Sequence, residues 1–243
     1  MLNIVLWKWE QPGSNRVYNS EHVNVMCSML RRNLPNTPHR IICVTDSDAG
    51  ITECETVPLW PDFNDLPNAS GKHLPSCYRR LKLYDPETQR DVLGINPGER
   101  IMGLDLDSLI TGDLRELVRI DGLFVGWHLL NHAQRLVFNG SLQMFTAGTL
   151  SDIWKDFDPA KSPKEAAYAN FRGSDQAWLS YKLCERPGCI GLQYPLVSSY
   201  PLQNRMLREL KAATRIVFFH GSMKPWDNAA RFTSRWIDRY WRH

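Results

Sequence analysis

Apolar residues along the chain gather into short runs whose spacing alternates between that of strands and that of helices. Residues 2–7 (LNIVLW) form a continuous apolar run of the length expected for a buried strand. Between residues 20 and 33, apolar positions recur at intervals of three and four, which predicts a helix capped by Ser20. Residues 39–45 (HRIICVT) predict a second strand. The order strand, helix, strand is typical of a parallel α/β sheet with right-handed crossovers.

The same kind of pattern continues to the end of the chain. Residues 100–104 (RIMGL) form another buried run, and this run leads directly into Asp105. Further strands are predicted at 53–59, 107–111, 123–127, 142–146 and 215–219, and helices at 76–84, 150–156, 174–185, 204–213 and 228–241. No stretch is typical of a linker or of an internal repeat. We therefore expect one α/β domain over residues 1–243.

Composition narrows the classes of protein to which the chain can belong. Its 243 residues suffice for one domain, and 43% apolar with 23% charged residues is ordinary for a globular protein. A formal charge of +3, from 29 basic and 26 acidic residues, is too weak to indicate a nucleic-acid partner. No apolar run approaches the roughly 18 residues of a membrane span, and no signal peptide is evident. We expect a cytoplasmic protein whose six cysteines are free thiols.

Two carboxylates follow the strand predicted at residues 100–104. Asp105 and Asp107 are two residues apart, so their side chains point the same way along an extended chain. Ligands of open α/β sheets bind at the carboxyl ends of the strands, which is where this pair is expected. Carboxylate oxygens suit Mg²⁺ or Mn²⁺, cations that commonly bridge phosphate oxygens. The pair is therefore a candidate metal site, although two acids in a solvated turn have the same sequence pattern.

The last predicted strand, at residues 215–219, leads into the segment HGSMKPW. His220 is a candidate third metal ligand, and Gly221 allows the backbone to approach a ligand closely. Lys224 would place a positive charge on a phosphate. A lone histidine at a strand end and a surface lysine would also explain these residues. Their occurrence together with the acidic pair favours one shared site.

Together these segments resemble the nucleotide-diphospho-sugar transferases of the GT-A fold, especially glycosyltransferase family 8, the group of glycogenin and galactosyltransferases. The family's strand, DxD motif and GDL-x-EL helix start correspond to RIMGLDLDSLITGDLREL, and its HxGxxKPW loop corresponds to HGSMKPW. The matching motifs lie between residues 18 and 226, which is nearly the whole chain. The resemblance implies a Rossmann-like GT-A domain with a mixed, mostly parallel sheet. It also implies a Mn²⁺ or Mg²⁺ ion on Asp105, Asp107 and His220, and a nucleoside-diphosphate sugar as donor.

Three further segments resemble the same family. CYRRLK is similar to its YxRL helix, which implies that Arg80 approaches the diphosphate and the acidic pair, whereas Arg79 is expected to be solvated. FNGSLQMF resembles FNSGVMLF, with Gly-Ser in place of Ser-Gly, and implies that Asn139 binds hydroxyls of the donor sugar. SDQ resembles the start of the DQ helix, so that Asp175 would hold the donor sugar and Gln176 would lie near its anomeric carbon. An acid in the first turn of a helix would equally explain Asp175.

The amino-terminal region departs from the family pattern. An Asp-x-x-Tyr segment usually follows the first strand, whereas WKWEQPG and a further loop precede Tyr18 here. Tyr18 is the candidate for stacking on the nucleobase, with Trp7 and Trp9 as alternatives, and the identity of the base stays open. Acceptor choice is expected on the loops 60–76 and 128–137, because specificity commonly lies on variable loops.

The helix predicted at residues 228–241 would be amphipathic and would carry two stripes. One stripe consists of Arg231, Arg235 and Arg239, and the adjacent one of Phe232, Trp236 and Tyr240. One interpretation is peripheral contact with the anionic inner face of a membrane, where lipid-linked acceptors reside. The other interpretation, which we favour, is packing of the aromatic stripe on the domain.

The resemblance implies transfer of a sugar to a hydroxyl of a glycan, lipid-linked or protein acceptor, with retention at the anomeric carbon. The metal and Lys224 would neutralise the departing diphosphate. One alternative is a phosphatase of the haloacid dehalogenase type. The segment DLDSL resembles the DxDx(T/V) nucleophile motif of these enzymes. That motif normally opens the first strand of the chain, however, whereas this one is at residue 105, and Leu109 stands here in place of Thr or Val. The other alternative is a nucleotide-sugar-binding protein without turnover.

Overall fold

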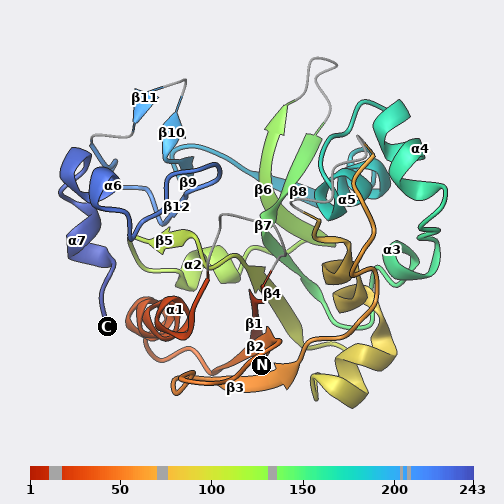
Figure 1. Cartoon of the computed structure of the whole chain (residues 1–243), viewed down its shortest axis with the longest axis horizontal. Helices are drawn as coiled ribbons and strands as arrows, with labels where there is room; N and C mark the ends of the chain where they lie inside the picture. Colours follow the sequence, from red (N-terminus) through yellow and green to blue (C-terminus); the bar gives the residue numbers. More distant parts are fainter. Residues whose placement is uncertain (11–17, 70–75, 131–135, 203–204, 207–208) are drawn as a thin grey trace.

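The computed structural model describes residues 1–10, 18–69, 76–130, 136–202, 205–206 and 209–243, and a mixed β-sheet forms its centre (Figure 1). In the described residues this sheet has the order β3 (Glu55–Pro58), β2 (His39–Thr45), β1 (Leu2–Lys8), β4 (Arg100–Leu104), β7 (Leu136–Thr146), β6 (Phe124–Leu130) and β8 (Cys189–Leu192). β7 runs antiparallel to both of its neighbours, and the other adjacent pairs are parallel. The predicted α/β class with a mostly parallel sheet is confirmed.

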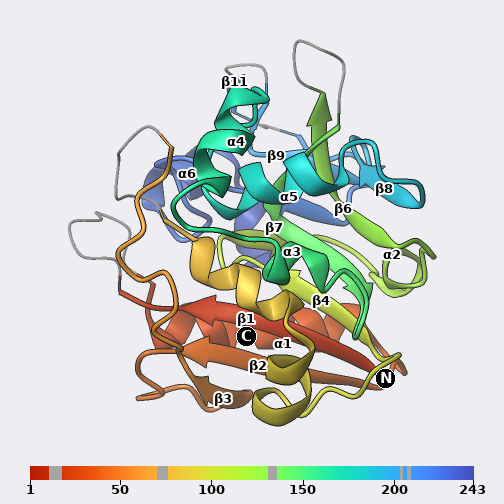
Figure 2. The ribbon, with the colours of Figure 1, turned by 90° about the vertical axis from the view of Figure 1, so that its right-hand side faces the viewer.

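Helices cover both faces of the central sheet (Figures 1 and 2). They are α1 (Ser20–Asn33), η1 (Tyr78–Tyr84), η2 (Thr88–Val92), α2 (Arg115–Val118), α3 (Asp152–Lys155), α4 (Ser162–Tyr168), α5 (Asp175–Leu183), α6 (Asn228–Thr233) and α7 (Ile237–Tyr240). Side chains of a strand alternate between its faces, so Ile4 and Leu6 join the core that α1 covers. Val5 and Trp7 join the opposite core, which η1 and α5 cover. The fully apolar run at the start of the chain is thus explained by burial on both faces.

A smaller sheet brings the end of the chain to the acidic pair. Its strands lie in the order β5 (Ser108–Ile110), β12 (Ile216–Phe218) and β9 (Val197–Ser199). β12 runs antiparallel to β5 with Phe218 opposite Ser108, and the N–H of Phe219 donates to the carbonyl of Asp107 at 3.0 Å. This register places the start of the HGSMKPW segment next to the segment that carries the two aspartates.

The prediction of a helix at residues 204–213 is wrong for the described part of this segment. Arg205–Met206 forms strand β11, which pairs antiparallel with β10 (Pro201–Leu202), and residues 209–213 are not helical. The remaining positions, 204 and 207–208, lie outside the described residues. Strand pairing satisfies the backbone groups that an isolated helix would otherwise satisfy, so tertiary context overrides the local pattern.

Other boundaries differ in smaller ways. The cap of α1 is Asn19 rather than Ser20, because the Asn19 carboxamide oxygen accepts the N–H of His22 at 3.2 Å. The segment predicted as a helix at 76–84 is a 3₁₀ helix over Tyr78–Tyr84. β7 is longer than the strand predicted at 142–146, and α4 was not predicted. Parts of the two expected acceptor loops, residues 70–75 and 131–135, lie outside the described residues.

Residues 228–241 form two short helices, α6 and α7, instead of the single helix expected. Between them Ser234 is only 1% exposed, and its hydroxyl lies 3.1 Å from the hydroxyl of Tyr200. This buried contact interrupts the helix, so the arginine and aromatic stripes do not continue along one face. The membrane contact inferred from those stripes therefore loses its structural basis. In the described part of the chain, no helix is long and apolar enough to cross a membrane.

Candidate active site

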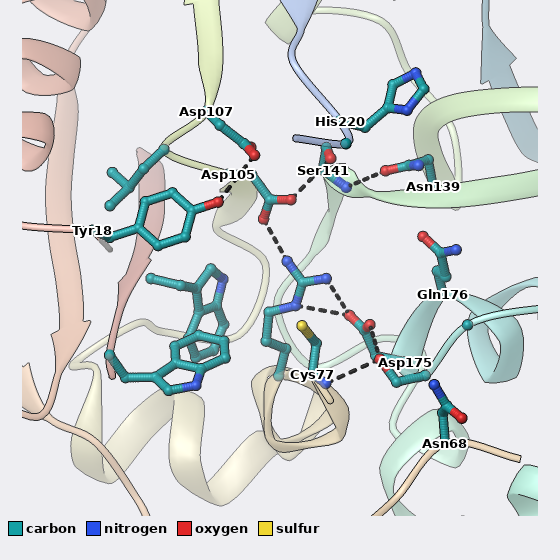
Figure 3. A pocket seen from close by; sticks show the side chains of 17 residues that line it. Tyr18, Asn68, Cys77, Asp105, Asp107, Asn139, Ser141, Asp175, Gln176 and His220 are labelled. Atoms are coloured by element: carbon teal, nitrogen blue, oxygen red, sulfur yellow. Dashed lines mark hydrogen bonds and ion pairs between the residues drawn. The ribbon is translucent and has the colours of Figure 1, made fainter. Parts of the chain in front are cut away.

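A pocket with a volume of about 320 Å³ lies beside the carboxyl ends of β1 and β4 (Figure 3). Most of the side chains singled out in the sequence line it. They are Trp7, Trp9, Tyr18, Arg80, Asp105, Asp107, Asn139, Asp175, Gln176, His220 and Gly221. Lys224 is not among the described residues that line the pocket. Segments separated by up to about 200 positions in the chain therefore converge on one cavity.

Asp105 lies at the end of β4 with both carboxylate oxygens engaged. Arg80 donates to one oxygen, and the hydroxyl of Ser141 donates to the other at 2.9 Å. Burial raises the pKa of Asp105, the Arg80 guanidinium lowers it, and the neighbouring charge of Asp107 raises it again. Arg80 thus favours the charged form of Asp105 in a site where burial and the neighbouring acid raise its pKa.

Arg80 joins Asp105 to Asp175. Its Nε donates to Asp175 Oδ2 at 2.8 Å, and its Nη2 lies 2.7 Å from the same oxygen. Burial lowers the pKa of Arg80, but the carboxylates of Asp105 and Asp175 raise it well above its ordinary value. Asp175 is itself only 2% exposed. Its ion pair with Arg80 accounts for its burial, which a solvated acid in the first turn of a helix would not show.

The Gly-Ser order at 140–141 has a clear packing reason. A Cβ on Gly140 would lie 2.5 Å from Nη2 of Arg80 and 3.2 Å from Oδ2 of Asp175. The absence of a side chain at 140 therefore lets Arg80 reach Asp175, while Ser141 supplies the hydroxyl that binds Asp105. Asn139 accepts the N–H of Ser141 at 2.9 Å, which holds its carboxamide at the rim of the pocket.

Gly140→Ala is expected to lower the free energy of unfolding by about 1–3 kcal/mol, because the methyl group overpacks the buried Arg80–Asp175 pair. Urea unfolding measures this effect. Gly103→Ala is the matched control, since a Cβ at that position of β4 has its closest contact at 3.6 Å. Equal stability of the two variants would show that Gly140 does not make room for Arg80.

Asp107 is held by Lys224 and Tyr18. The Lys224 ammonium donates to Asp107 Oδ2 and, at 3.0 Å, to the carbonyl of Phe219, and Lys224 is only 5% exposed. The Tyr18 hydroxyl donates to the same carboxylate oxygen at 3.0 Å. In this arrangement Lys224 neutralises Asp107 from the buried side instead of projecting into the pocket. The edge of the Tyr18 ring packs against Trp226, with 5.8 Å between centroids.

His220 lies at the rim of the pocket, and its imidazole points away from Asp105 and Asp107 (Figure 3). Its Nε2 forms a hydrogen bond with the hydroxyl of Ser199, and its ring lies 5.5 Å from that of Trp127. Among the described residues, no three His, Cys, Asp or Glu side chains are grouped closely enough to hold a metal ion. The donor chemistry nevertheless fits Mn²⁺ or Mg²⁺, because two carboxylates and an imidazole line one pocket. Sequence reasoning missed Ser199, which no motif marked.

The indole rings of Trp7 and Trp9 form another wall of the pocket. Trp7 packs edge-on against Trp60 at 5.4 Å, and the guanidinium of Arg79 lies over the Trp9 ring at 5.6 Å. The expectation that Arg79 is solvated is therefore wrong. Arg79 is 5% exposed and also donates to Asn64, because the 3₁₀ geometry of η1 turns this side chain toward the tryptophans.

His22 belongs to the aromatic cluster that anchors the HGSMKPW segment. Its ring stacks on Trp226 with 3.8 Å between centroids and 15° between planes. Its Nδ1 accepts the N–H of Asn19 at 3.1 Å, which requires an unprotonated nitrogen. Burial lowers the pKa of His22 from 6.5 to about 4, although Glu21 and Asp227 raise it.

Acidification from about pH 7 to about pH 4 is therefore expected to lower the free energy of unfolding by on the order of 2 kcal/mol through His22. The unfolded ring takes up a proton near its ordinary pKa, whereas the folded ring resists protonation until about pH 4, so the unfolded state binds more protons in this window. Urea unfolding at several pH values in this range measures how steeply the free energy of unfolding falls as the pH is lowered. His22→Gln keeps an acceptor for Asn19 but cannot titrate, so an equal slope in this variant would contradict the assignment.

No family model matches the chain, and no curated protein matches it. Its structure is similar to that of galactosyltransferase LgtC in complex with donor and acceptor sugar analogs, with a TM-score of 0.64, 14% identity and coverage of 98% of this chain and 96% of that chain. It is also similar to mouse xyloside xylosyltransferase 1, with a TM-score of 0.54, 13% identity and coverage of 90% and 97%. A third similar structure is glycosyltransferase GlyE of Streptococcus pneumoniae TIGR4, with a TM-score of 0.53 and 13% identity. The similarity covers 94% of this chain and 57% of that chain. The chain therefore has the fold of these glycosyltransferases, the GT-A fold that its own motifs resemble.

Proposed function

We propose that the chain is a metal-dependent glycosyltransferase that moves a sugar from a nucleoside-diphosphate sugar to an acceptor hydroxyl with retention. One observation carries this proposal. The acidic pair after β4, the Arg80–Asp175 pair and the histidine after β12 line a single pocket in a chain with a glycosyltransferase fold. The solved LgtC structure contains donor and acceptor sugar analogs, which supports the same substrate classes here.

Asp105 and Asp107 would hold the Mn²⁺ or Mg²⁺ ion, and His220 would join them once its imidazole turns from Ser199 toward the pocket. When bound, such an ion supplies positive charge that stabilises a departing diphosphate. Lys224 adds a second positive charge at the buried side of Asp107. Gly221 has a φ of 99°, and apart from its two chain neighbours no described residue has an atom within 4 Å of the position of its absent Cβ. Its backbone thus leaves room for a phosphate group in the pocket.

Asp175, Asn139 and Gln176 form the end of the pocket proposed for the donor sugar. Arg80 fixes Asp175 and neutralises its charge, so the carboxylate can accept hydrogen bonds from sugar hydroxyls. The side-chain nitrogen of Gln176 donates to the carbonyl of Arg172 at 3.1 Å. Its side-chain oxygen would then face the anomeric carbon of the donor sugar. A front-face attack, in which the leaving phosphate accepts the proton of the acceptor hydroxyl, needs no enzyme nucleophile. At the other end, Tyr18, Trp7 and Trp9 are the candidates for contact with the base.

Thermal-shift screening with UDP, GDP, ADP, CMP and their sugars tests this proposal. One nucleoside diphosphate is expected to raise the melting temperature in the presence of Mn²⁺ and much less in its absence. A response that ignores Mn²⁺ would favour a binding protein without metal-dependent turnover. Release of phosphate from generic phosphate esters would favour the phosphatase alternative.

A further inference from the structure

Cys77 lines the pocket but has no role in the chemistry proposed so far. It directly precedes η1, and its carbonyl accepts the N–H of Arg80 at 3.0 Å. Its own N–H donates to the Ser174 hydroxyl at 3.0 Å, and that hydroxyl lies 3.3 Å from Oδ1 of Asp175. Both backbone groups of Cys77 are therefore tied to the residues that build the Arg80–Asp175 pair. These hydrogen bonds fix the backbone of Cys77 beside the pocket.

The part of the pocket near Cys77 is polar but carries little net charge. Asn68 and Gln176 contribute carboxamides, and Arg80 neutralises Asp175 at 2.7 Å. Cys77 is half-buried and forms no disulfide, and Figure 3 shows its sulfur among the side chains that line the cavity. Carboxamides and a paired carboxylate offer hydrogen bonds to hydroxyl groups, while a thiol offers a small and weakly polar surface. This combination suits an uncharged, hydroxyl-bearing ring.

We infer that Cys77 forms part of the wall against which the donor sugar lies, and that it restricts the donor to an uncharged sugar with a small substituent facing the thiol. This inference rests on the proposed function, because Asp175 and Gln176 define the sugar end of the pocket. It adds a specificity-determining residue from the segment before η1. The diphosphate end, at Asp105 and Asp107, is not expected to contact Cys77.

Protection of Cys77 from alkylation tests the inference on the unmodified chain. The folded protein is treated briefly with iodoacetamide, and labelling of each cysteine is followed by peptide mass spectrometry. The probes are the nucleoside diphosphate and the hexose conjugate, from the UDP, GDP and ADP series, that give the largest Mn²⁺-dependent thermal shift. At about ten times the dissociation constant of the conjugate, labelling of Cys77 is expected to slow about ten-fold, because only about one site in eleven is then open.

The nucleoside diphosphate at matched occupancy is expected to protect Cys77 much less, because it leaves the sugar end of the pocket open. Cys184 is the internal control, since it is also half-buried but lies in a separate surface groove with Tyr181 and Lys182. Its labelling is expected to stay constant in all samples. Equal protection of Cys77 by both probes would place the thiol near the diphosphate and overturn the inference.

Substitution gives a second and independent test. Cys77→Val adds a methyl group to the wall and is expected to lower kcat/KM for the donor about ten-fold or more, because one extra carbon in a fitted pocket has effects of this size. Affinity for the nucleoside diphosphate alone is expected to stay within about two-fold, and Cys77→Ser, which keeps the size, is expected to stay near the wild type. Equal loss of affinity for both ligands in Cys77→Val would indicate a general structural role.

Failure of the inference can be told apart from failure of the proposed function. If the hexose conjugate binds but does not slow the labelling of Cys77, the inference is wrong and the proposed function still stands. Absence of a Mn²⁺-dependent thermal shift with every nucleotide, together with unprotected Cys77, would remove both.

Discussion

Asp107→Asn is expected to lower the rate of sugar transfer by about 10³-fold or more, because the variant loses a charged ligand for the metal that stabilises the departing diphosphate. Asparagine keeps an oxygen that can accept a hydrogen bond from the buried Lys224 ammonium, so the fold is expected to survive. Alanine at this position would instead leave the buried Lys224 ammonium with no side-chain acceptor at residue 107, at a cost of about 3–5 kcal/mol. The test is the initial rate of transfer with saturating Mn²⁺, together with urea unfolding.

Asp113→Asn is the matched control for this experiment. Asp113 lies in the GDL-x-EL helix start that follows the DxD motif, but it pairs with Arg115 and lies outside the described residues that line the pocket. Its side chain is 43% exposed, so its substitution is expected to change neither the rate nor the stability by much. Wild-type activity in Asp107→Asn would exclude Asp107 from the metal site.

Arg80→Met is expected to lower the free energy of unfolding by about 3–5 kcal/mol and to abolish activity, because it removes a cation that pairs with both Asp105 and Asp175. Burial and Asp107 already raise the pKa of Asp105, and loss of the Arg80 guanidinium would raise it further above that of the unfolded chain. The folded variant would then bind more protons than the unfolded chain. Its loss of free energy of unfolding relative to the wild type is therefore expected to be larger near pH 8 than near pH 5. Urea unfolding at both pH values measures this difference.

The neighbouring Arg79 provides a control for loss of a buried guanidinium. Arg79 is about equally buried, but its partners are the carboxamide of Asn64 and the ring of Trp9. Arg79→Met is therefore expected to cost only about 1–2 kcal/mol, with little dependence on pH. If both variants lost the same stability with the same pH dependence, the Arg80 ion pairs would not account for the effect.

The main elements of the site could be predicted because its key side chains come directly after apolar runs that form strands. Asp105 follows β4 and His220 follows β12, and both side chains line the pocket. Apolar runs were sufficient to find these two strands. The parallel pairing of β1 with β2 also follows from the strand–helix–strand pattern at the start of the chain.

The partners of these residues could not be predicted, because they depend on packing between distant segments. An ammonium group can pair with a phosphate or with a carboxylate, and only the fold shows that Lys224 contacts Asp107. The Ser199 contact with His220 arises because β9 lies beside β12, a pairing that no local pattern encodes. Similarly, the spacing in residues 228–241 suited one long helix, yet burial of Ser234 against Tyr200 interrupts it.

The most direct test of the proposed function is the product released from the nucleotide sugar that gives the largest thermal shift. The purified chain is incubated with this donor and Mn²⁺, with and without simple sugar acceptors, and nucleoside diphosphate, free sugar and inorganic phosphate are measured separately. We predict Mn²⁺-dependent release of the nucleoside diphosphate, by transfer or by slow hydrolysis, and its loss in Asp107→Asn. An intact donor in every condition, or release of inorganic phosphate in place of the nucleoside diphosphate, would contradict the assignment of this chain as a glycosyltransferase.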